Sequence, residues 1–163
     1  MFRSPLLPVL LVCAAPATAD LSVTFTEGAP KDRFRIVNDG ACATVPGLLE
    51  IDLSGAAGGL VFDVTGAGAG VEVFQPFEVE GDGAALTALP RVADGDRRID
   101  LPLAALPAGA ELSFTIDIDD TVSARGITVS GSELSGAVVR MSGRTAPFGQ
   151  GARAALPTEA CTS

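Results

Sequence analysis

The sequence predicts an all-β protein, built as a single antiparallel β-sandwich of about nine strands. Two observations lead to this fold class. Apolar side chains recur with a period of two along most of the chain, whereas helical periodicity is almost absent. Clusters of Gly, Pro, Asn and Asp interrupt the alternation about every ten residues, as turns do. Residues 20–163 are expected to form one domain, because no linker or repeat divides them.

The strands expected in the first half begin with a clear alternation. Leu21, Val23 and Phe25 point to one face and the intervening Ser and Thr residues to the other. A Gly-rich link at 66–70 precedes β-branched residues rather than a helix, so it predicts a hairpin or a bulged crossover and not a phosphate-binding loop. The strands expected here are 21–26, 33–37, 48–53, 60–64 and 71–74.

The second half opens with a loop-like segment at 80–90. The run 112–118 is the cleanest alternation in the chain, with Phe114, Ile116 and Ile118 on one face. The other strands expected here are 99–103, 127–129, 134–141 and 152–156.

The first nineteen residues read as a secretory signal peptide. Arg3 gives a positive start, an apolar run of about ten residues follows, and small residues precede a cleavage point between Ala19 and Asp20. The run is too short for the roughly 20 residues that span a bilayer. A lipoprotein anchored at Cys13 is disfavoured by the bulky Val12 before it. We therefore expect a periplasmic or extracellular protein without a membrane span after cleavage.

The composition excludes several classes of function. The net charge of −9 repels phosphate backbones and anionic lipids, which argues against nucleic-acid and membrane-surface binding. The chain has no His, so Ser-His and Cys-His nucleophile pairs and imidazole metal ligands are excluded. We expect a protein that is not an enzyme, and chemistry based on carboxylates alone stays open as the weaker alternative.

The cysteines predict one disulfide. Cys13 leaves with the signal peptide, so an exported chain would retain only Cys42 and Cys161. No Cys-x-x-Cys pattern is present, so the bridge would be structural rather than redox-active. Two free thiols are the alternative.

One acidic cluster could hold a metal. Asp117, Asp119 and Asp120 end the cleanest strand, and alternation places Asp117 and Asp119 on one face. Carboxylates are the hard oxygen ligands that calcium prefers, although this is not an EF-hand loop. The alternative is a solvated strand edge whose charges prevent association between edges. A second cluster, at 94–100, alternates acids with arginines and predicts weak surface ion pairs.

The segments 27–34, 51–55, 61–77 and 116–121 resemble small exported alphaproteobacterial proteins called aggregation factor core proteins, and this resemblance implies calcium-linked cell adhesion. Glu27-Gly28 and Ile118-Asp119-Asp120 are also similar to two motifs at the calcium end of Calx-β domains. That similarity implies an immunoglobulin/Calx-β-like sandwich. It adds Glu27 to the expected calcium ligands Asp117, Asp119 and Asp120.

These observations favour a non-enzymatic exported binding or adhesion module with a protein or cell-surface partner and calcium as its cofactor. The alternative is a periplasmic accessory or carrier module whose sandwich edge takes a peptide or a partner strand.

Overall fold

A computed structural model describes residues 18–29, 31–66, 74–81, 83–122, 128–149 and 151–160. These residues contain no helix, and their eleven strands form three antiparallel sheets. The all-β class is thereby confirmed. Accordingly, no helix in the described part of the chain could cross a membrane.

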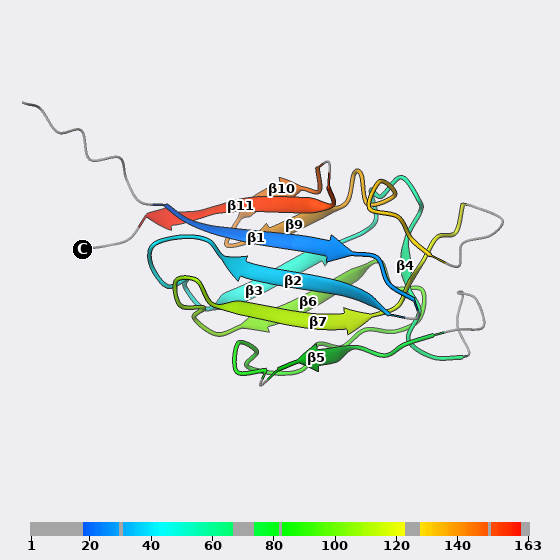
Figure 1. Ribbon diagram of the computed structural model, residues 1–163, viewed down its shortest axis with the longest axis horizontal. Helices are drawn as coiled ribbons and strands as arrows, with labels where there is room; N and C mark the ends of the chain where they lie inside the picture. Colours follow the sequence, from blue (N-terminus) through cyan, green and yellow to red (C-terminus); the bar gives the residue numbers. More distant parts are fainter. Residues whose placement is uncertain are drawn as a thin grey trace, which may run out of the picture.

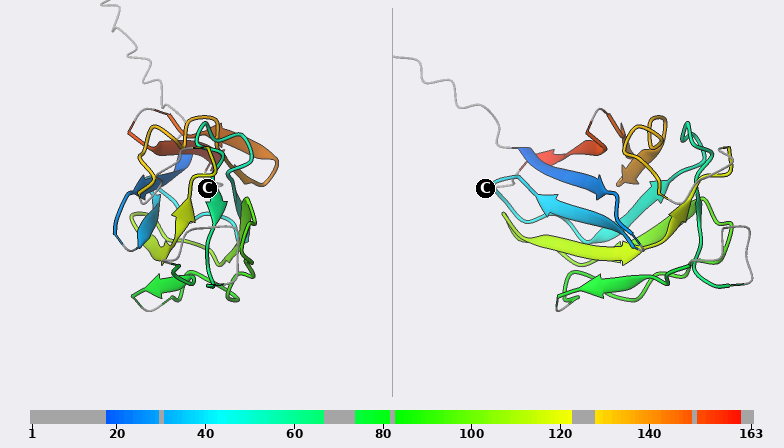
Figure 2. Two further views of the ribbon diagram at one scale, coloured as in Figure 1. Left: turned by 90° about the vertical axis from the view of Figure 1, so that its right-hand side faces the viewer. Right: turned by 45° about the vertical axis from the view of Figure 1, so that its right-hand side comes forward.

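The two larger sheets form the two layers of the sandwich (Figure 1). The front sheet has the order β11-β1-β2-β7-β5, and the sheet behind it has the order β10-β9-β3-β6. An end-on view places these sheets on opposite sides of the molecule (Figure 2, left). The front strands are β1 (Thr18–Thr26), β2 (Asp32–Asn38), β5 (Glu78–Glu80), β7 (Glu111–Ile116) and β11 (Arg153–Ala160). The rear strands are β3 (Gly47–Asp52), β6 (Arg98–Leu103), β9 (Val138–Met141) and β10 (Arg144–Pro147).

A third, two-stranded sheet lies at one end of the sandwich. It pairs β4 (Val61–Phe62) with β8 (Ile118–Asp119). The right-hand side of Figure 1 shows β4 at this end, where the turns from both layers gather. This small sheet positions the acidic side chains described below.

One hydrophobic core cluster fills the space between the layers. Phe34 and Phe114 stack with ring centroids 5.3 Å apart in the front sheet, and Leu49, Ile51 and Leu101 are fully buried from the rear sheet. Burial on β2 alternates as the sequence pattern predicts, since Phe34 and Ile36 are buried while Arg33 and Arg35 are exposed.

Six of the expected strands are confirmed, with small shifts at their ends, and the differences concern short elements. The expected strand 60–64 is hydrogen-bonded as a strand only at Val61–Phe62, and the expected strand 134–141 only from Val138 onward. Thr128 and Val129 are not in a strand, and 71–73 lie outside the described residues. The count is eleven strands rather than about nine because β5 and β10 were not expected and the run 112–118 is divided in two.

That division occurs at Asp117. β7 ends at Ile116, and Ile118 turns away from the front sheet to pair with Phe62 in the small sheet. The sequence alternation continues through this point, but the hydrogen-bonding partner changes. Asp117 therefore occupies a junction between two sheets and not the middle of one strand.

Two further predictions involve residues outside the described part. Most of the predicted signal peptide lies within residues 1–17, and Cys161 follows the last described residue. Cys42 is disulfide-bonded. The loop that contains Cys42 follows β2. Asn38 at the end of β2 and Leu156 in β11 both pair with Leu21, so this loop and the end of β11 lie at the same end of the front sheet. The pairing of Cys42 with Cys161 stays a prediction.

Candidate metal centre

The junction between β7 and β8 brings three aspartates together. Asp63 directly follows β4, Asp117 directly precedes β8, and Asp119 is the last residue of β8. Their backbones are fixed by hydrogen bonds: the Asp63 N–H donates to the Asp117 carbonyl at 3.1 Å, and Gln75 accepts from Asp117 and donates to Asp63, both at 3.2 Å. The positions of the three side chains are therefore set by sheet pairing.

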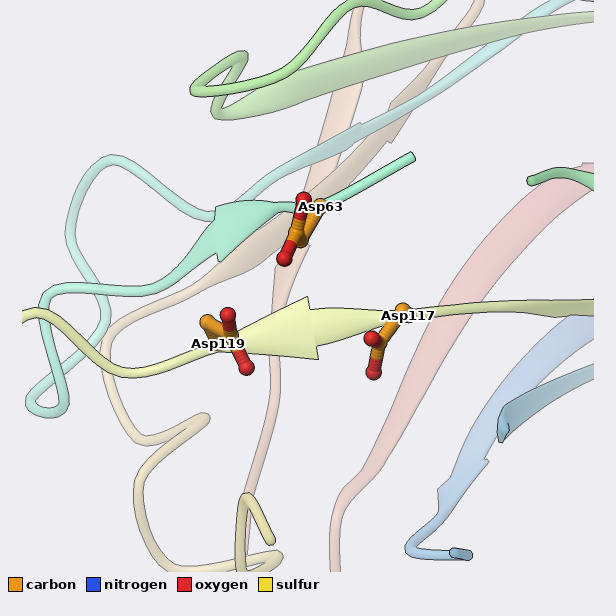
Figure 3. A group of neighbouring side chains, drawn as sticks. All are labelled: Asp63, Asp117 and Asp119. Atoms are coloured by element: carbon orange, nitrogen blue, oxygen red, sulfur yellow. The ribbon is translucent and has the colours of Figure 1, made fainter. Parts of the chain in front are cut away.

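The three carboxyl groups turn toward one shared space beside β8 (Figure 3). One oxygen from each of Asp63, Asp117 and Asp119 lies within 4.8 Å of the other two. The structure thus brings together two of the residues expected from the sequence and adds Asp63, which was not expected. Glu27 is exposed and Asp120 is half-buried, and neither belongs to this triad.

Asp63 is the least solvated member of the triad. Its side chain is 1% exposed, and neither carboxylate oxygen has a hydrogen-bond partner. Asp119 is 4% exposed, so its carboxylate does not lie on a solvated strand edge, whereas Asp117 and Asp120 are half-buried. Burying a carboxylate without a hydrogen-bond donor or a cation destabilises the folded state, because no interaction with the protein replaces the lost hydration.

A fourth aspartate supports the triad from the front sheet. Asp32 is 2% exposed and accepts hydrogen bonds from the backbone N–H of Gly28 at 3.1 Å and of Ile118 at 3.3 Å. It thereby fixes the turn after β1 against the first residue of β8. Burial raises the pKa of Asp32 to about 7, with the charges of Asp117 and Asp119 adding to the increase.

The pKa values of two triad members are also raised. Burial, together with the negative charges of Asp119 and Asp63, raises the pKa of Asp117 to about 7. Burial, together with the charge of Asp119, raises the pKa of Asp63 to about 6. No described Lys or Arg forms a salt bridge with Asp63 or Asp117. The cause is therefore desolvation and mutual repulsion between like charges.

Asp94 brings a further negative charge to the same end. Its Oδ1 accepts hydrogen bonds from the backbone N–H groups of Val64 and Thr65, both at 2.7 Å, and its Oδ2 accepts one from the Thr65 hydroxyl. The bond from the Thr65 hydroxyl is the largest influence on the pKa of Asp94, which lies below its usual value. Asp94 therefore stays ionised, and its charge contributes to the raised pKa of Asp63.

This arrangement suits a hard divalent cation. Several carboxylate oxygens converge in a small space, and the end of the sandwich has excess negative charge. Calcium takes six to eight oxygen ligands in adaptable geometry, so backbone carbonyls and water could complete such a shell. Without an ion, burial and mutual repulsion favour the protonated form of these carboxyl groups, and the raised pKa values of Asp63 and Asp117 express this preference.

Asp63 and Asp32 were missed for different reasons. Asp63 interrupts the apolar run 60–64, and an acid within a predicted buried strand is a signal in itself. Asp32 lies between Lys31 and Arg33, and nothing in this charged context indicates burial. Its burial depends on the Ile118 backbone, 86 positions away.

No family model, curated protein or solved structure matches this chain. The resemblances drawn from the sequence therefore stay predictions.

Proposed function

We propose that this protein is an exported, non-enzymatic binding or adhesion module that binds calcium through Asp63, Asp117 and Asp119. The observation that carries the proposal is the buried Asp63 carboxylate, which lacks a hydrogen-bond partner and faces two other acids. A bound cation would supply the missing partner and remove the repulsion within the triad.

Calcium is preferred to a transition metal because the site offers carboxylate oxygens and no nitrogen or sulfur ligand. It is preferred to magnesium because magnesium demands near-ideal octahedral geometry and keeps several waters, whereas calcium accepts converging carboxylate oxygens in adaptable geometry. The expected dissociation constant is on the order of 10⁻⁴ to 10⁻³ M, the range of extracellular calcium modules.

The adhesion role follows from what the ion would connect. Asp63 follows β4, while Asp117 and Asp119 flank and end β8, so one ion would tie together two segments from distant parts of the chain. A two-residue ladder is a weak link by itself. Calcium would make this end of the sandwich rigid enough to engage a protein or cell-surface partner outside the cytoplasm.

The test combines ion binding with adhesion. Beads coated with the mature protein are expected to cluster in millimolar calcium. They should disperse in a chelator or when magnesium replaces calcium at the same concentration. Beads coated with Asp63→Asn protein should stay dispersed throughout. Clustering that is insensitive to the chelator would contradict a calcium-linked adhesion role, and an unchanged melting curve in calcium would contradict the site.

One observation favours the second candidate function, an accessory module that takes a partner strand at its edge. Among the described residues β5 pairs only with β7, so no described strand covers its outer edge. Beside it lies a hollow of about 340 Å³ lined in part by Val79, Leu86 and Leu89, and Leu89 is 73% exposed. An extended peptide could add to β5 and place a side chain in this hollow.

Displayed random peptides offer a direct test of this edge. Selection against the wild-type protein should return an alternating apolar consensus whose binding is lost in Leu89→Asp. Leu48→Asp, which changes another exposed leucine, is the matched control. Failure to enrich any consensus would count against this function.

A further inference from the structure

A second candidate site lies on the outer face of the rear sheet. There the loop before β6 meets the end of β3 around a hollow of about 380 Å³. Three arginines and three aspartates provide most of its lining: Arg91, Arg97, Arg98, Asp52, Asp96 and Asp100. None of the triad aspartates takes part, so this site is separate from the proposed calcium site.

The wall of the hollow is held by backbone hydrogen bonds. The Leu53 N–H donates to the Arg97 carbonyl at 2.7 Å, and the Phe62 N–H donates to the Asp96 carbonyl at 2.8 Å. The Asp96 carboxylate accepts from the Ala93 N–H at 2.8 Å, which closes the turn between them. The loop is thus anchored to β3 and β4, and the hollow exists before any ligand arrives.

The arginines here differ from the other cations of the protein. Acidic residues outnumber basic ones by 20 to 11, and most described cations have a carboxylate partner. Among the described residues only Arg91, Arg97 and Arg144 form no salt bridge, and two of these three line this hollow. Arg98 has only long contacts, 3.6 Å to Glu50 and 3.8 Å to Asp100. Guanidinium donors are therefore available for a ligand.

The aspartates of the hollow are engaged in different ways. Asp52 lies 2.6 Å from the Arg140 guanidinium, which also contacts Glu50, and accepts from the Ser54 N–H at 2.9 Å, so it is already engaged. The Oδ1 atom of Asp100 is buried, and no described group donates a hydrogen bond to it. The acceptors that the lining offers beside the free guanidinium donors are therefore the other carboxylate oxygens and the Ser54 hydroxyl.

We propose that this hollow binds a small hydroxylated carboxylate of the hexuronic-acid type. Arg91 and Arg97 would receive the carboxylate, because a guanidinium presents paired N–H donors that match its two oxygens. Ser54 and the aspartates would accept hydrogen bonds from ligand hydroxyls. The three arginines and three aspartates balance in charge, so a singly charged sugar acid fits better than a doubly charged phosphate. The hollow is within the usual size range of ligand sites, roughly 300–1,000 Å³.

The test is a titration of the isotope-labelled mature protein with galacturonate, followed by amide shifts in the presence of a chelator. Galacturonate is expected to shift the amides of 91–98, while galactose, which lacks the carboxylate, should not. Arg91→Gln with Arg97→Gln should weaken binding by at least about tenfold, the loss expected for charge-assisted hydrogen bonds. Arg144→Gln, which removes the remaining unpaired described arginine, should leave the affinity unchanged.

Three outcomes would overturn this assignment: equal binding of galactose, tighter binding of inorganic phosphate, or an equal loss in Arg144→Gln. A melting curve of the double variant establishes that it is folded, and a retained calcium response separates failure here from failure of the calcium site. A parallel titration with trigalacturonate tests whether the ligand is a free sugar acid or part of a polysaccharide. Affinity equal to the monomer's supports a free acid, whereas tighter binding supports a residue of a polysaccharide.

Discussion

Replacing Asp63 by Asn should stabilise the calcium-free protein and remove most of its stabilisation by calcium. The change keeps the side-chain shape and removes one negative charge from the triad. Burial and the charge of Asp119 raise the pKa of Asp63 from 3.8 to about 6, or about two pKa units. Each unit corresponds to about 1.4 kcal/mol, so removing the charge should stabilise the calcium-free protein above pH 7 by about 1–3 kcal/mol.

The calcium response of the wild-type protein follows from mass action. With a Kd of about 1 mM, 10 mM calcium stabilises the folded state by about 1.4 kcal/mol, and with a Kd of about 0.1 mM by about 2.7 kcal/mol. At about 2–4 °C per kcal/mol for a domain near this size, the Tm should rise by about 3–11 °C. Asp63→Asn should lose most of this rise because it removes one of the three anionic ligands.

Thermal unfolding at pH 8 in a chelator, in 10 mM calcium and in 10 mM magnesium measures both effects. Glu27→Gln and Asp120→Asn are the controls, because the sequence pattern includes these residues among the ligands and the described triad does not. Loss of the calcium response in both controls, with retention in Asp63→Asn, would refute the assignment to the triad. A less stable calcium-free Asp63→Asn protein would refute the argument from repulsion.

Four further outcomes are expected. The calcium-free protein should become less stable as the pH rises from about 4 to 7, because the raised pKa values make the folded chain bind protons more tightly than the unfolded chain in that window. Urea unfolding at several pH values measures this dependence, and saturating calcium should make it smaller. Non-reducing peptide mapping should recover Cys42 joined to Cys161, and reduction should cost a few kcal/mol at most. Phe34→Ala should destabilise the protein by about 3–5 kcal/mol in urea unfolding, since Phe34 is fully buried and contacts three other Phe rings. Intact-mass analysis of exported protein should place the cleavage between Ala19 and Asp20, and a lipid-modified Cys13 would contradict it.

The long strands could be predicted because their burial follows their own sequence. On β2 and β7, inward residues are apolar and most outward ones are polar, so the period of two is visible locally. The hairpin of β9 and β10 was missed although it carries a turn signal. Ser142 and Gly143 both have positive φ, at 50° and 76°, as a two-residue hairpin turn requires. β5 gives no such signal, because its three residues are two glutamates around one valine.

The candidate site could be predicted only in part, for a related reason. Asp117 and Asp119 were found because they are close together in the sequence. Asp63 joins them through the pairing of Val61 with Asp119, a contact between positions 58 residues apart that no local pattern contains. The expectation for Glu27 came from a motif, whereas the buried acid near that turn is Asp32, which accepts the Gly28 N–H.

The negative charge of the triad is left uncompensated because of where the nearby arginines lie, and not only because acidic residues outnumber basic ones. The end of the loop before β6 and the first residue of β6 carry Asp94, Arg97 and Arg98 within five positions. Asp94 is held against the backbone that follows Asp63, while the two arginines line the hollow on the outer face of the rear sheet. The same short segment thus adds negative charge beside the triad and holds positive charge away from it. A fold selected only for stability would use one of these arginines to neutralise the buried acids. The free energy lost by burying an unpaired carboxylate is larger than the free energy gained from a surface ion pair. Keeping the two charges apart leaves Asp63 and Asp117 without a described cationic side chain, as the proposed calcium site requires, and leaves Arg97 without a carboxylate partner, as the proposed carboxylate site requires.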